Sequence, residues 1–328
     1  MAYLLFLLTG WMLFMRGTVA QATRQAMESC LFVLVPTLFP CMVLCLCLLR
    51  YVDAPPKFLK KLWRYLGLPD GSFYPFWLGL LGGYPTGARL LADMKSKNRI
   101  SKAQARAALG FCVNPSISFV LGFWDSLGWV FYLCLFMCDL MLGMVLCRAE
   151  EESFALKNLP HFGTILSESI FSATQSMLAV LGSTVFFSAV RACLGAHPRL
   201  YGMDITSELL ELGAGGEKQM LLAAMLTAFG GLSVFMQVRV LCDFAGVGFL
   251  LCAGIKGAGV MLLMLLAQKK GTACAAAFGG FIIIILAALK QRAVWRRWSC
   301  CKDTGCDPIH HSKQEPFRRQ TQAPRFHT

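Results

Sequence analysis

The chain has 328 residues, of which 56% are hydrophobic and 15% are charged, and its formal net charge is +13. In soluble globular domains about a quarter of all residues are charged. The lower fraction here excludes an ordinary soluble enzyme and indicates a surface that faces lipid. The positive charge would suit nucleic acid, but the basic residues lie in the breaks between apolar runs, as the positive-inside rule describes for loops. We therefore predict an all-α, polytopic membrane protein that contacts membrane lipid and binds no nucleic acid.

The first fifteen residues, up to Met15, are apolar and are followed by Arg16. They could form a secretory signal with Thr18-Val19-Ala20 as its cleavage site. However, the segment has no basic region before the apolar stretch, and its positive charges follow that stretch instead. We expect residues 1–16 to be a transmembrane anchor whose N-terminus lies outside the cell.

The remainder of the apolar sequence contains an internal repeat. Residues 29–43 align with residues 176–190 at a shift of 147 positions, and Gly82-Gly83 coincide with Gly230-Gly231 at a shift of 148 positions. The apolar run at 127–147 aligns further downstream at the same shift. A conserved order of elements at a nearly constant offset predicts a duplicated architecture.

This repeat predicts the following organisation: a first half, a linker, a second half and a basic tail. The tail is polar and rich in Arg, Pro and Gln, which is typical of disorder, and we expect it to lie in the cytoplasm. The predicted boundaries are 17–147 for the first half, 148–170 for the linker, 171–297 for the second half and 298–328 for the tail.

Several apolar segments are interrupted by Gly or Pro. The interruptions lie at Pro36 and Pro40, at Gly82-Gly83, at Asn114-Pro115-Ser116 and, in the second half, at Gly230-Gly231. Backbone groups freed at membrane depth need protein or a water-filled cavity around them, and interrupted segments at matching places in two halves indicate a transporter's binding site. The alternative is that the glycines allow close helix packing and the prolines only kink a span.

The predicted solute-binding residues are the polar and glycine positions at these interruptions and their equivalents in the other half. They are Thr37, Gly82, Gly83, Tyr84, Pro85, Thr86, Gly87, Arg89, Asn114, Ser116, Thr184, Gly230, Gly231, Ser233 and Gln237.

Ionisable residues inside apolar runs are functional candidates by default. Asp139 lies in the middle of such a run, and Lys256 lies about ten residues into another. Asp139 could couple solute movement to a proton or cation, with Arg89 or Lys256 attracting an anionic group. Alternatively, Asp139 and Lys256 form a buried structural ion pair, and the arginines reach an interface.

The motifs Pro-Thr-Leu-Phe-Pro at 36–40, Gly-Gly-Tyr-Pro-Thr-Gly-Ala-Arg at 82–89 and Phe-Cys-Val-Asn-Pro-Ser at 111–116 occur in this order. In this respect the chain resembles the sporulation integral membrane protein YlbJ family, which carries the nucleoside-recognition or gate domain. The resemblance covers most of residues 1–290. It implies a spore-forming bacterial source, a role in spore formation or cortex assembly, and gate-type repeats like those of concentrative nucleoside transporters.

Two topologies fit the sequence. If residues 28–50 and 170–190 each cross the membrane, the two halves are parallel. If both are re-entrant hairpins, the halves are inverted, as the gate-domain resemblance implies. The basic loop at 94–106 favours the parallel arrangement, whereas duplicated interrupted elements usually serve alternating access. We predict inverted repeats with broken or re-entrant helices.

No catalytic motif is found, so we predict neither an enzyme nor a cofactor. The tail residues Cys300, Cys301, Cys306, His310 and His311 lack the spacing of a zinc site. We predict no metal site there. The leading hypothesis is a secondary transporter or permease for a small polar solute, with a nucleoside-like compound as one option, in a bacterial cell membrane. The alternative is a non-transporting scaffold for spore-envelope assembly. Whether the chain forms a homo-oligomer is left open.

Overall fold

The computed structural model describes residues 2–52, 55–124, 127–147, 161–195, 202–203, 208–209, 212 and 217–304, with side chains described up to residue 290. The described residues are almost entirely helical and include no strand. The chain divides into two units, Met1–Ala287 and Ala288–Thr328. The second unit is described only as the last part of a helix that ends at Thr304.

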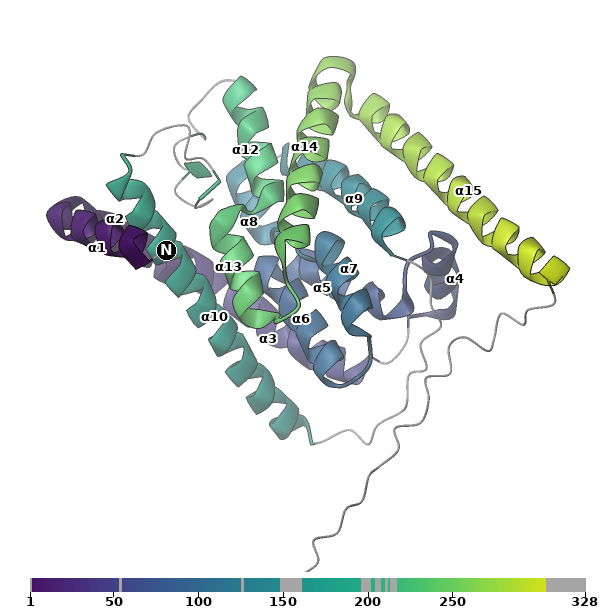
Figure 1. The fold of residues 1–328 in the computed structure, drawn as a ribbon, viewed down its shortest axis with the longest axis horizontal. Helices are drawn as coiled ribbons and strands as arrows, with labels where there is room; N and C mark the ends of the chain where they lie inside the picture. Colours follow the sequence, from purple (N-terminus) through teal and green to yellow (C-terminus); the bar gives the residue numbers. More distant parts are fainter. Residues whose placement is uncertain are drawn as a thin grey trace, which may run out of the picture. The chain divides into compact units, whose positions relative to one another are not determined.

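Figure 1 shows the described helices. In chain order they are α1 (Ala2–Phe14), α2 (Arg16–Ser29), the π-helical turn η1 (Cys30–Leu34), α3 (Val35–Tyr51), α4 (Lys57–Tyr65), the 3-10 turn η2 (Asp70–Ser72), α5 (Phe73–Gly82), α6 (Tyr84–Ser96), α7 (Lys102–Cys112), α8 (Ile117–Trp124), α9 (Leu127–Leu146), α10 (Phe162–Cys193), α12 (Glu217–Phe229), α13 (Gly231–Leu241), α14 (Val247–Lys270) and α15 (Thr272–Thr304).

Within the described residues, seven helical segments are long and apolar enough to cross a membrane. The predicted all-α fold is confirmed, and these segments fit a multi-pass membrane protein. α1 has 13 residues, which is shorter than the length a full span requires. The seven segments are Arg16–Tyr51, Lys102–Trp124, Leu127–Leu146, Phe162–Cys193, Glu217–Leu241, Val247–Lys270 and Thr272–Lys290.

The predicted interruption at Pro36 and Pro40 is wrong. The helix continues from Arg16 to Tyr51, and both prolines lie inside α3. The π-helical turn η1 comes directly before them, and the Val35 amide donates to the carbonyl of Cys30, five residues back. A π-turn widens the helix locally, and at this position it accommodates residues that lack a backbone donor without ending the helix.

Residues 28–50 and 170–190 are not re-entrant hairpins, because both lie in continuous helices. A hairpin forms instead from α5 and α6, which pack against each other on either side of Gly83. Their contact is close because Gly79 and Gly87 face each other, and a Cβ at either position would collide with the carbonyl oxygen of Cys112. The second half has no such hairpin at the equivalent place, since α12 and α13 form one bent span.

The helix directions do not fit a uniformly inverted repeat. Arg50, at the end of α3, lies 3.2 Å from Glu168, near the start of α10, so the first long helices of the two halves run antiparallel. α7 and α14 run parallel, because Arg106 contacts the Phe244 carbonyl just before α14, and Lys256 contacts the Val113 carbonyl just after α7. The difference arises because the α5–α6 hairpin returns the chain to the end of the bundle it came from, whereas α12–α13 continues across.

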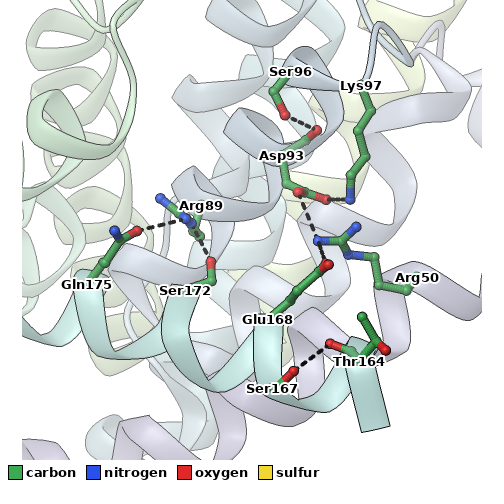
Figure 2. Close-up of polar contacts among 10 residues, drawn as sticks. All are labelled: Arg50, Arg89, Asp93, Ser96, Lys97, Thr164, Ser167, Glu168, Ser172 and Gln175. Carbon is green, nitrogen blue, oxygen red and sulfur yellow. Dashed lines mark hydrogen bonds and ion pairs between the residues drawn. The ribbon is translucent and has the colours of Figure 1, made fainter. Parts of the chain in front are cut away.

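Charged residues gather at one end of the bundle, where α3, α6 and α13 end and where α7, α10 and α14 begin. We call this the basic end. Here Arg50 lies 3.5 Å from Asp93 and 3.2 Å from Glu168, and Lys97 pairs with Asp93 at 2.6 Å (Figure 2). The contacts join α3, α6 and α10. Under the positive-inside rule, this end is the one expected to face the cytoplasm.

Asp243, in the loop between α13 and α14, forms an ion pair with Lys95 at the end of α6. Lys95 donates to its carboxylate at 3.1 Å, and this hydrogen bond lowers the pKa of the Asp243 carboxyl below its ordinary value of 3.8. A pKa lowered on folding means that the ion pair stabilises the fold above the unfolded-state pKa. This stabilisation is lost as the pH falls through the folded-state pKa.

We expect Lys95→Met to raise the pKa of the Asp243 carboxyl towards its ordinary value, because the variant removes the hydrogen-bond donor. A carboxyl-detected NMR titration measures the change. Lys57→Met, which removes an exposed lysine from the separate helix α4, should leave this pKa where it is. An Asp243 pKa that is the same with and without Lys95 would contradict the assignment.

Candidate functional site

Three of the helix interruptions meet around one small cavity of about 40 Å3. α6 begins there after Gly83, α8 begins there after Ser116, and the first turns of α13 form a further wall. α10, through Val180 and Thr184, and the η1–α3 segment, through Leu34 and Leu38, complete the lining. The lining residues are Leu34, Leu38, Gly83, Tyr84, Pro85, Ser116, Phe119, Val180, Thr184, Ser233, Val234 and Gln237. The cavity therefore lies between the two halves of the sequence.

The paired glycines give the chain the backbone shape that this meeting point requires. Gly83 has a φ of +88° and Gly230 a φ of +84°, values that L-residues with a side chain rarely adopt. A Cβ on Gly83 would lie 3.1 Å from the Ser116 side chain, and one on Gly230 would lie 3.3 Å from the ring of Tyr84. The two Gly-Gly motifs thus lie close together, with Tyr84, next to the first motif, packed on Gly230 of the second.

Four polar side chains line this cavity without a hydrogen bond of their own to the described part of the chain. The Tyr84 hydroxyl is buried with no partner there. No side-chain hydrogen bond to another described residue involves Thr184, Ser233 or Gln237, which are 2%, 1% and 4% exposed. Buried polar groups in folded proteins nearly always have a partner, so these four side chains are placed to bind water or a solute.

The start of α13 is held by a different set of contacts. The Leu232 and Ser233 amides donate to the carbonyls of Gly202 and Met203 at 2.7 and 3.0 Å. The amides of Gly202 and Met203 in turn donate to the carboxylate of Glu208, which is fully buried. The first amides of α13 are therefore already used, and the polar contribution of α13 to the cavity comes from its side chains.

The interruption between α7 and α8 is supported from two neighbouring helices. Lys256 of α14 donates at 2.7 Å to both the Val113 carbonyl and the Asn114 side-chain oxygen. Tyr132 of α9 donates to the Pro115 carbonyl at 2.6 Å. Lys256 is 2% exposed, and its charge lies at the C-terminal end of α7, where the helix dipole favours a cation. The backbone groups freed at this break are thus satisfied inside the protein.

Asp139 lies in the same buried cluster and does not line the cavity. Its Oδ1 is 3.4 Å from Lys256 Nζ, and the side chain of neither residue is more than 1% exposed. This is the buried ion pair that the sequence offered as one alternative for Asp139. The 3.4 Å separation is longer than the 2.7–2.9 Å of a strong charge-assisted hydrogen bond, because Lys256 directs its shortest contacts to the interrupted backbone.

The structure brings about half of the predicted solute-binding residues to the cavity. Those that line it are Gly83, Tyr84, Pro85, Ser116, Thr184, Ser233 and Gln237. A second group lies directly behind this lining and shapes it through backbone or packing contacts: Gly82, Thr86, Gly87, Asn114, Gly230 and Gly231.

Two predicted residues are placed elsewhere. The Thr37 hydroxyl donates to the Val33 carbonyl of its own helix at 2.7 Å, and its side chain is exposed. Figure 2 shows Arg89 directed to α10, where it donates to Ser172 at 2.6 Å and to Gln175 at 3.2 Å. Arg89 and Gln237 occupy equivalent positions after the paired glycines, but only Gln237 lines the cavity, whereas Arg89 is directed to α10.

Sequence reasoning missed the apolar walls of the cavity and the support from Tyr132. Five apolar residues complete the lining: Leu34, Leu38, Phe119, Val180 and Val234. Tyr132 precedes Asp139 by seven positions, so both lie on the same face of α9. That spacing was the available signal that α9 presents a polar face to the interrupted segment.

The proposed absence of a metal site in the tail concerns residues whose side chains lie outside the described part of the chain. Among the described residues, no group of three His, Cys, Asp or Glu side chains is arranged to hold a metal ion. The described cysteines are free thiols, most of them buried inside the bundle, whereas Cys274 is exposed.

The fold and the cavity define a polytopic helical membrane protein in which interrupted helices surround a small, mostly apolar cavity with a few polar side chains in its lining. Comparison of the chain with models of protein families, with curated proteins and with solved structures gives no match.

Proposed function

We propose that the protein is a membrane transporter or permease whose small polar solute binds in the cavity between Gly83, Ser116 and the first turns of α13. The observation that carries the proposal is the group of four polar side chains without hydrogen-bond partners that meet there: Tyr84, Thr184, Ser233 and Gln237. In folded proteins, buried polar groups nearly always have partners, so four such side chains meeting at one cavity support a site for a solute.

The lining also favours a class of solute. The hydroxyls of Tyr84 and Thr184 and the amide of Gln237 can donate hydrogen bonds, and α6 and α8 begin at the cavity with the positive ends of their helix dipoles. Among the residues that the structure describes, no charged side chain lines the cavity. These groups suit a solute that presents hydrogen-bond acceptors, such as carbonyl or carboxylate oxygens.

The size of the cavity indicates what must move. A volume of about 40 Å3 holds about two or three water molecules, whereas sites for larger organic ligands have about 300–1,000 Å3. A nucleoside-like solute would therefore require the chamber to widen. The α5–α6 hairpin is the element suited to this, since its tip forms one wall of the cavity and both of its ends lie at the basic end.

A comparison of small metabolites in cells with and without the protein would identify candidate solutes. Uptake of the candidate into proteoliposomes then tests the site. We expect Gln237→Leu to weaken the apparent affinity for the solute by about tenfold, because one hydrogen bond of about 1 kcal/mol is lost and buried solute atoms lose their partner.

Gln25→Leu provides the matched control, since Gln25 is an exposed glutamine of α2, and its uptake should equal that of the unmodified protein. Unchanged uptake in Gln237→Leu, together with unchanged uptake in Thr184→Val, would remove the site from the transport hypothesis.

The resemblance to the YlbJ family supplies the cellular setting that we propose, a role in spore formation in the membrane of a spore-forming bacterium. Within that setting, a non-transporting scaffold for envelope assembly is the second candidate. It is favoured by the fact that Arg89 and Asp139 are both engaged in internal contacts. Normal sporulation in strains carrying Gln237→Leu, combined with defects that follow the loss of a protein partner, would support the scaffold.

A further inference from the structure

A second, larger hollow lies at the basic end, away from the cavity. It has a volume of about 710 Å3 and lies between α7 and α14, with the loop from Asp243 to Gly246 along one side. Leu146, at the end of α9, and Arg239, near the end of α13, complete its walls. We refer to this hollow as the α7–α14 groove.

Two arginines from different helices converge on the α7–α14 groove. Arg106 of α7 donates through Nε to the Phe244 carbonyl at 3.3 Å, and Arg239 of α13 donates through Nη1 to the Ala245 carbonyl at 2.6 Å. A guanidinium group carries five N–H donors, so each contact leaves most of the donors available. The two carbonyl contacts hold both charges beside the same loop.

The acidic residue of the groove is already balanced by other groups. Asp243 lies 3.1 Å from Lys95 and 4.0 Å from Lys102. The hydrogen bond from Lys95 keeps the pKa of its carboxyl low, so the carboxylate stays charged and paired with these lysines. The charges of Arg106 and Arg239 are thus left to attract an anion from outside the chain.

The remaining walls of the groove and its surroundings are apolar. Ala107, Gly110, Val247 and Phe249 line it. Val247 and the following α14 residue Leu251 are 69% and 63% exposed. In a membrane-spanning helix, an exposed apolar face contacts lipid tails. The groove therefore combines a cationic part at the basic end with an apolar part that leads towards the lipid-facing surface.

We propose that the α7–α14 groove binds the phosphate headgroup of an anionic phospholipid. Arginine donates to phosphate oxygens through paired N–H groups, and basic pockets between membrane helices on the cytoplasmic side suit anionic headgroups. One acyl chain follows the apolar wall formed by α7 and α14. This site is separate from the cavity and does not depend on transport.

Native mass spectrometry of the purified full-length chain in detergent tests the proposal, with phosphatidylglycerol and phosphatidylcholine as the two probes. We expect retained phosphatidylglycerol and little phosphatidylcholine. Each of Arg106→Gln and Arg239→Gln should weaken phosphatidylglycerol binding about fivefold, since a basic residue near an anionic membrane surface contributes about 1 kcal/mol. The double variant should weaken it by more than tenfold.

Arg16→Gln is the matched control, because it removes an exposed arginine at the start of α2. This start lies close to Trp11, which donates to the Cys193 carbonyl at the end of α10 opposite the basic end. Phosphatidylglycerol binding by Arg16→Gln should equal that of the unmodified protein. Thermal unfolding of each variant without added lipid separates loss of binding from loss of fold. Equal phosphatidylglycerol binding by the double variant and the control, or equal retention of the two lipids by the unmodified protein, would overturn the proposal.

Discussion

Replacing Lys256 with Met should destabilise the protein by about 3–5 kcal/mol, because the variant leaves Asp139 as an uncompensated buried charge. The same change removes the ammonium group that donates hydrogen bonds to the Val113 carbonyl and to the Asn114 side-chain oxygen. The midpoint of unfolding in mild detergent should fall accordingly, and the interrupted segment between α7 and α8 should gain hydrogen exchange before the rest of the bundle does.

Lys269→Met is the control on the same helix, because Lys269 is exposed at the end of α14. It should shift the midpoint little. The double variant Lys256→Met with Asp139→Leu removes both charges together and should recover part of the lost stability, as replacement of buried ion pairs by apolar residues does elsewhere. A Lys256→Met variant as stable as the Lys269→Met control would show that this cluster does not support the fold.

The second large effect is expected at Gly87. A side chain at this position meets the Cys112 carbonyl oxygen at once, and a backbone atom cannot move aside as a flexible side chain can. Gly87→Val should therefore push α6 away from α7 and cost at least about 1–3 kcal/mol, as overpacking does in well-packed interiors. If the cavity transports a solute, uptake should be lost as well, because the hairpin tip at Gly83 moves with α6.

Gly182→Val is the matched control, since Gly182 lies in the middle of α10 with open space around it. It should retain the expression level, the unfolding midpoint and the uptake of the unmodified protein. The displacement can be measured by crosslinking cysteine pairs introduced into α6 and α7. Equal crosslinking in Gly87→Val and in Gly182→Val would contradict it.

The helices of this protein could be predicted from sequence to a large extent, because a run of about twenty apolar residues with few charges forms an α-helix across the lipid bilayer. The paired glycines also indicated their breaks correctly, since a positive φ is a local property of the chain. Pro36 and Pro40 predicted a break that does not occur, because the π-helical turn just before them lets the helix continue. No residue pattern in the sequence predicts that turn.

The site could be predicted only in part, because its geometry depends on how separate helices pack. Gln237 and Arg89 are equivalent in sequence, yet one faces the cavity and the other bonds to α10. α6 and α13 both run from the cavity to the basic end, so the difference lies in the neighbours that each side chain meets, which the linear sequence does not give. The close contact of Gly79 and Gly87 in the hairpin has no counterpart in the second half, where Thr227 and Phe235 stand at the positions shifted by 148.

The α5–α6 hairpin also determines whether the number of membrane crossings up to a given residue is odd or even. A segment that enters and leaves by the same face adds no pass through the bilayer. Arg50 and Asp93 hold the ends of α3 and α6 together at 3.5 Å, so we expect both ends to face the same compartment. If the hairpin straightened into a single pass, everything on one side of it would change compartment relative to the other. Tags inserted before α4 and after α6 would then report opposite accessibility instead of the shared accessibility that the hairpin dictates.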